Sequence, residues 1–149
     1  MIYVVDASVA VKWFVFEGDH KMAQALVAID VALTAPDLIF AELANVLRRK
    51  VRGGLVTEDQ AREALETMQT TFSAAVRSSD LLQRAFELSA MLDHSVYDCL
   101  YLACADQAED RILVTADDKF VAKAVSAGHG HKIITLSDAV AGIAAGQEH

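Results

Sequence analysis

Short apolar runs alternate along the chain with longer segments whose apolar residues recur every three or four positions. The short runs predict buried strands, because they are continuous and rich in β-branched residues, and the longer segments predict amphipathic helices. Strands are expected at residues 2–5, 31–35, 72–76, 111–115 and 132–135, with the weakest pattern at 72–76. Such an alternation predicts an α/β fold, in which a parallel sheet is covered by helices on both faces.

Helices are expected at residues 8–16, 19–29, 36–52, 57–70, 80–92, 95–108 and 117–126, with a last one capped by Ser137. Pro36 stands in the first turn of the third helix, where its missing N–H does no harm. Thr57 and Gln60 form a capping box for the fourth helix. No repeat, linker or low-complexity tract interrupts the chain, so residues 1–149 are expected to form a single domain.

The composition narrows the class of protein. Hydrophobic residues make up 54% of the 149 residues, yet no run of ~18 apolar residues is free of charge, so no membrane span is expected. The first residues lack the basic region of a signal peptide. Cys99 and Cys104 are five positions apart on an expected helix and point in different directions, so they do not pair with each other. Unpaired cysteines favour a cytoplasmic location.

The charge balance is acidic, with 13 basic against 21 acidic residues and a formal net charge of -8. This excess argues against a protein that binds nucleic acid through a broad basic surface. It does not exclude a protein that meets phosphates through bound metal ions.

Four carboxylates stand among apolar neighbours: Asp6, Glu42, Asp98 and Asp117. Asp98 is the sharpest anomaly, because the pattern of its helix predicts burial on every side. The partial positive charge at the start of a helix stabilises a carboxylate by only ~1 kcal/mol, which is less than the cost of burying its charge. Each of the others has an ordinary alternative. Asp6 suits a helix N-cap, Glu42 suits a single exposed acid, and two acids often open a helix, so Asp118 competes with Asp117.

Taken together, the four acids predict a metal site. Asp6 and Asp117 follow the carboxyl ends of two expected strands, and Glu42 and Asp98 open helices that can line the same crevice. Carboxylates in one pocket repel one another unless cations bind. Hard oxygen ligands select Mg²⁺ or Mn²⁺, and such ions promote phosphodiester hydrolysis by activating water and stabilising the leaving oxygen.

Four segments in this order resemble the PIN-domain family, and within it the VapC-type toxins of prokaryotic toxin–antitoxin pairs. The matching segments are VVDASV, FAELANVLRR, YDCLYLACA and LVTADDKF, and the resemblance covers nearly the whole chain. It implies a PIN-like three-layer sandwich with a mostly parallel sheet of four or five short strands. It also implies a metal-dependent endoribonuclease, a cognate antitoxin protein and a homodimer.

The resemblance assigns roles to residues of this chain. Asp6, Glu42, Asp98 and Asp117 are implied to be the catalytic, Mg²⁺- or Mn²⁺-binding acids, with Ser8, Asn45 and Thr115 in support. His94, four residues before Asp98, is expected in a surface or capping role rather than in catalysis.

Contact with RNA needs some positive charge even beside a metal site. Lys12 follows the first acid and is expected near the crevice, while Arg48 and Arg49 belong to a basic cluster at a helix end. The cluster has an alternative explanation, since cations at a helix C-terminus complement the helix dipole.

Two other classes of function remain open. A phosphatase of the haloacid-dehalogenase type would use Asp6 as nucleophile, but it wants a second aspartate two residues later, where Ser8 stands. The presence of all four acids argues against a non-catalytic interaction domain of the same fold. Such a domain would behave in the same way after the acids are removed.

Overall fold

A computed structural model describes residues 1–15, 20–28 and 31–147 of the chain. Its centre is a four-stranded, fully parallel sheet in the order β2-β1-β3-β4. The strands are β1 (Ile2–Val5), β2 (Ala32–Thr34), β3 (Arg111–Thr115) and β4 (Ile133–Thr135). The α/β class is therefore confirmed, and the sheet has four strands, within the expected four or five.

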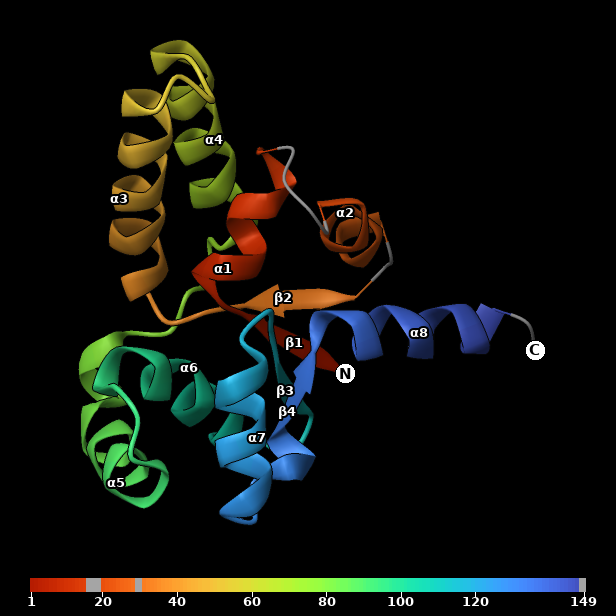
Figure 1. The fold of residues 1–149 in the computed structure, drawn as a ribbon. Coiled ribbons are helices and arrows are strands. Elements are labelled where there is room, and N and C mark those ends of the chain that lie inside the picture. The colour runs from red at the N-terminus through yellow and green to blue at the C-terminus, as the bar shows by residue number, and fades with distance from the viewer. Residues whose placement is uncertain (16–19, 29–30, 148–149) are drawn as a thin grey trace.

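Helices cover both faces of this sheet, as Figure 1 shows. On one side lie α1 (Ala7–Ala10), α2 (His20–Ala28), α3 (Leu38–Arg52) and α4 (Glu58–Thr71). On the other side lie α5 (Leu82–Leu92), α6 (Val96–Asp106) and α7 (Asp118–Ser126). The last helix is α8 (Leu136–Gln147), and three short 3-10 turns complete the order: η1 (Val11–Trp13), η2 (Ser78–Asp80) and η3 (Gly130–Lys132). None of the described helices is long and apolar enough to span a bilayer.

The expected strand at 72–76 is wrong. The backbone there makes only an isolated bridge between Pro36 and Val76, because Phe72 ends α4 as its C-cap and a turn follows. The side chain of Phe72 is buried in the core, so its apolar character reflects packing rather than a strand.

Local chemistry explains most helix boundaries. Thr57 and Gln60 form the predicted capping box of α4, with both reciprocal hydrogen bonds present. Ser137 does not cap the last helix: it lies in its first turn, and the Thr135 hydroxyl accepts the hydrogen bond from the Asp138 backbone N–H. Cys99 and Cys104 are both buried and free, as their spacing predicted.

The register of the two central strands determines where the site forms. Val5 pairs with Val114 in the parallel ladder between β1 and β3, so the residues that follow the two strands emerge at the same edge of the sheet. Asp6 and Asp117 come from these two strand ends. In an open parallel α/β sheet, this edge is where ligands bind.

Candidate functional site

A small polar pocket of about 100 Å³ opens at this edge of the sheet. It is lined by Asp6, Ala7, Ser8, Glu42, Asp98, Tyr101, Thr115, Asp117 and Phe120. All four acids singled out from the sequence therefore meet in one place. A larger hollow of about 370 Å³ between α5 and α7 has no carboxylate in its lining, so size alone does not locate the chemistry.

Asp6 caps α1 and lines the pocket at the same time. Its Oδ1 accepts hydrogen bonds from the Ser8 hydroxyl at 2.6 Å and from the Val9 backbone N–H at 3.1 Å. Burial raises the pKa of the Asp6 carboxyl, the hydroxyls of Ser8 and Thr115 lower it, and the charge of Asp98 raises it again. The capping role and the pocket role thus belong to the same side chain.

Asp117 reaches the pocket from the start of α7. Its Oδ1 accepts a hydrogen bond from the Phe120 backbone N–H at 3.1 Å, and its own N–H donates to the Thr115 hydroxyl at 3.1 Å. The neighbouring Asp118 is exposed and does not line the pocket. Of the two acids that the sequence left open, Asp117 is the one that faces the other carboxylates.

Glu42 carries the clearest electrostatic anomaly. Its Oε1 is buried without a hydrogen-bond partner among the described residues, and so is the Tyr101 hydroxyl beside it. Burial, followed by the charge of Asp98, raises the pKa of Glu42 to about 7. The nearby Tyr101 hydroxyl opposes this rise, although the geometry gives the two side chains no hydrogen bond with each other.

Asp98 is less buried than the sequence predicted. Its side chain is 44% exposed, because the fully buried part of α6 begins only at Cys99. One of its oxygens, Oδ2, lies 2.7 Å from Nε2 of His94, whose side chain is 14% exposed. The surface or capping role expected for His94 did not foresee this contact, for which the four-residue spacing between the two residues is the sequence signal.

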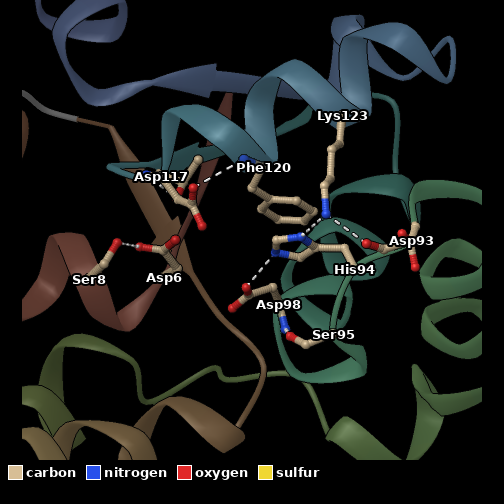
Figure 2. Close-up of polar contacts among 10 residues, drawn as sticks. Asp6, Ser8, Asp93, His94, Ser95, Asp98, Asp117, Phe120 and Lys123 are labelled. Atoms are coloured by element: carbon tan, nitrogen blue, oxygen red, sulfur yellow. Dashed lines mark hydrogen bonds and ion pairs between the residues drawn. The ribbon is translucent and has the colours of Figure 1, made fainter.

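The donor set of the pocket fits a hard divalent cation. Ligand atoms of His94, Asp98 and Asp117 all lie within 4.8 Å of one another. Figure 2 shows Asp6, Asp98 and Asp117 directed toward a common space. Carboxylate oxygens are the ligands that Mg²⁺ and Mn²⁺ prefer. A cation here would lower the raised pKa values of Asp6 and Glu42 and give the unpaired Glu42 oxygen a partner.

The residues expected to support the acids or to contact RNA do not all line the acidic pocket. Ser8 and Thr115 line the pocket, whereas Asn45 is exposed on α3 outside it. A neighbouring hollow of about 440 Å³ is lined by Ala7, Ser8, Val11, Lys12, Val46, Arg49, Lys50 and Leu55, so it shares two residues with the acidic pocket. Arg48 does not line this hollow. Its guanidinium forms a bidentate ion pair with the carboxylate of Glu58, with N–O distances of 2.7 and 3.0 Å.

Comparison with known proteins agrees with this geometry. The PIN domain family model matches residues 3–126. Ribonuclease VapC3 of Pyrobaculum aerophilum is 34% identical over 115 residues, which are 76% of this chain and 88% of the relative. Ribonuclease VapC1 of Mycobacterium tuberculosis is 32% identical over 121 residues, which are 80% of this chain and 88% of the relative.

A solved structure shares the whole architecture. The crystal structure of PAE2754 from Pyrobaculum aerophilum superimposes with a TM-score of 0.72, covering 97% of this chain and 90% of that one. The two sequences are 21% identical, so this likeness concerns the fold alone.

Proposed function

Because the chain belongs to the PIN-domain family, and within it to the VapC-type ribonucleases, we propose that it is the toxin of a toxin–antitoxin pair, an endoribonuclease. The single observation that carries the proposal is the meeting of Asp6, Glu42, Asp98 and Asp117 in one pocket at the carboxyl edge of the sheet. In this proposal residues 1–149 act as one domain.

The four acids are proposed to hold Mg²⁺ or Mn²⁺. Such an ion, when bound, activates water for attack on a phosphodiester and stabilises the leaving oxygen. The chain's own part is to orient the carboxylates. Ser8 holds Asp6 through a hydrogen bond, and the Thr115 hydroxyl holds the backbone of Asp117. Burial and the charge of Asp98 raise the pKa of Glu42 to about 7, so the site without a cation holds this carboxylate less readily than water would.

The hollow beside the pocket is the proposed path of the RNA backbone. Lys12, Arg49 and Lys50 line it, and Arg49 lies two helical turns along α3 from Glu42, or ~10 Å. Cations at that distance would contact phosphates that flank the one being cleaved. Arg48 pairs with Glu58 on α4 and does not line the hollow, so the proposed RNA contacts are Lys12, Arg49 and Lys50, which do line it.

Protein partners are part of the same proposal. A cognate antitoxin would block the pocket, and a homodimer would cover exposed apolar side chains. On α5, Phe86 is 71% exposed and Leu82, one turn earlier, is 49% exposed. Exposed apolar side chains gathered on one face are typical of protein contacts. Sedimentation of the wild-type chain and of Phe86→Ser would measure this association, which the substitution is expected to weaken.

The test of the main proposal is cleavage of RNA. The purified chain is incubated with a labelled pool of cellular RNA and Mg²⁺ or Mn²⁺, with EDTA and Asp6→Asn as controls. Discrete cuts that disappear in both controls are expected. Cleavage that survives EDTA, or an Asp6→Asn chain that cuts as well as the wild type, would contradict it.

A further inference from the structure

His94 lies beside the acidic pocket, between Asp98, Phe120 and Lys123, as Figure 2 shows. Its ring stacks on Phe120 with centroids 4.4 Å apart and planes only 7° from parallel. The backbone N–H of His94 donates to the Ser89 carbonyl at the end of α5. Packing therefore fixes the plane of the imidazole and leaves its two nitrogens facing different partners.

One of these partners, Lys123, determines which nitrogen carries the proton. Its Nζ lies 3.4 Å from Nδ1 of His94 and donates a second hydrogen bond to the Asp93 carbonyl at 2.7 Å. A lysine ammonium group only donates hydrogen bonds. Nδ1 must therefore accept, which places the proton of the neutral ring on Nε2.

The protonated nitrogen faces Asp98. Nε2 of His94 lies 2.7 Å from Oδ2, so its N–H donates to that oxygen and leaves the second oxygen for a cation. The Asp98 backbone N–H donates to the Ser95 hydroxyl at 3.2 Å, which fixes the main chain at the same residue. Backbone and side chain of Asp98 are thus held by separate contacts.

A single helix supplies most of this arrangement. Asp117 caps α7, and Phe120 and Lys123 follow at intervals of three residues on the same helix. Asp93, with φ 50°, is in the left-handed conformation at the end of α5, and its carbonyl accepts a hydrogen bond from Lys123, so α7 also contacts the turn before α6. Helix α7 therefore places Asp117 at the pocket and, through Phe120 and Lys123, also contacts His94, which orients Asp98.

We propose that His94 is a positioning residue for the metal site, and that Lys123 keeps it in the tautomer that donates to Asp98. This inference rests on the proposed metal-binding function of the pocket. A role for His94 as a direct ligand fits less well, because Nε2 is engaged by Asp98 and hard ions prefer oxygen. Outer contacts of this kind are typically worth about 10–100-fold in metal affinity.

Two substitutions separate the hydrogen bond from the packing. His94→Gln keeps an N–H donor near Nε2 but loses the ring, whereas His94→Phe keeps a flat ring on Phe120 but loses the donor. Titration of the folded proteins with Mn²⁺ is expected to show affinity reduced about tenfold in His94→Phe and within about threefold of wild type in His94→Gln. Equal affinities in the two variants, whether unchanged or equally reduced, would overturn the proposal.

A second measurement needs neither metal nor a substitution at His94. Nitrogen-15 spectra of the wild-type chain without metal, recorded where the spectra themselves show a neutral His94 ring, are expected to place the ring proton on Nε2. Lys123→Ala is expected to give a mixture of tautomers under the same conditions. A proton on Nδ1 in the wild type, or no change in Lys123→Ala, would overturn the role of Lys123. If the wild type binds no Mn²⁺, the proposed metal function fails, while these spectra still decide whether Lys123 selects the tautomer of His94.

Discussion

Glu42 and Tyr101 line the same acidic pocket, and neither Oε1 of Glu42 nor the Tyr101 hydroxyl has a hydrogen-bond partner among the described residues. Buried polar atoms without partners cost free energy, typically ~1–3 kcal/mol each. The fold tolerates this cost at the place where four carboxylates meet. A bound cation would relieve it by pairing with the buried carboxylate.

Glu42→Gln should change how stability depends on pH. The pKa of Glu42 in the folded chain is about 7, above its ordinary value of 4.5, so the folded state binds more protons than the unfolded state between these values. The free energy of unfolding therefore falls as the pH rises through this window. The substitution should reduce that fall by ~1–2 kcal/mol, after allowance for solvent screening.

Denaturant unfolding of the metal-free proteins from pH 4 to 9 measures this difference. The exposed Glu63 on α4 offers a matched control, since Glu63→Gln removes the same charge far from the pocket. A Glu42→Gln curve parallel to that of the wild type would refute the assignment of a raised pKa to this carboxyl.

Metal ions should stabilise the folded chain. A ligand present at 100 times its Kd adds ~2.7 kcal/mol, which for a chain of this size raises Tm by roughly 5–10 °C. In Asp6→Asn the rise should shrink, while metal-free folding is retained because asparagine also caps helices. Thermal unfolding with and without Mn²⁺ checks this, and an equal rise in both proteins would place the metal elsewhere.

Asp117 and Asp118 should respond differently to the same substitution. Asp117→Asn keeps an N-cap for α7 but removes a carboxylate from the pocket, so RNA cleavage should fall by tenfold or more with little loss of stability. Asp118→Asn changes an exposed residue outside the pocket and should cleave as the wild type does. Cleavage rates under equal metal concentrations decide between them, and the reverse ranking would exchange the roles of the two acids.

Arg49→Ala should weaken RNA binding more than Arg48→Ala. Both changes remove one positive charge from α3, but only Arg49 lines the hollow beside the acidic pocket, whereas Arg48 is paired with Glu58. Losing one phosphate contact should lower the slope of log affinity against log salt by about one. Binding of a labelled single-stranded RNA in EDTA, between 50 and 200 mM salt, measures the slope. Identical slopes for the two variants would remove the hollow from the RNA path.

Local sequence chemistry predicted many of the strands and helices correctly. The β-branched run at Ile2–Val5, the capping box at Thr57 and the apolar strand before Asp117 all occur as expected. Prediction failed where packing outweighed local pattern. Phe72 has the pattern of a strand residue but packs into the core at the end of α4. Asp98 has the pattern of a buried residue but lies on the partly exposed first turn of α6.

The sequence by itself determined which residues carry the charge and which strands and helices present them, because periodicity and capping act over a few residues. Only the tertiary structure decided that Asp117 rather than Asp118 faces the pocket, that Arg48 pairs with Glu58, and that Lys123 contacts His94. These choices depend on the parallel register of β1 with β3 and on the packing of α7 against the turn before α6. Contacts between segments so distant in the chain leave no periodic trace in the sequence.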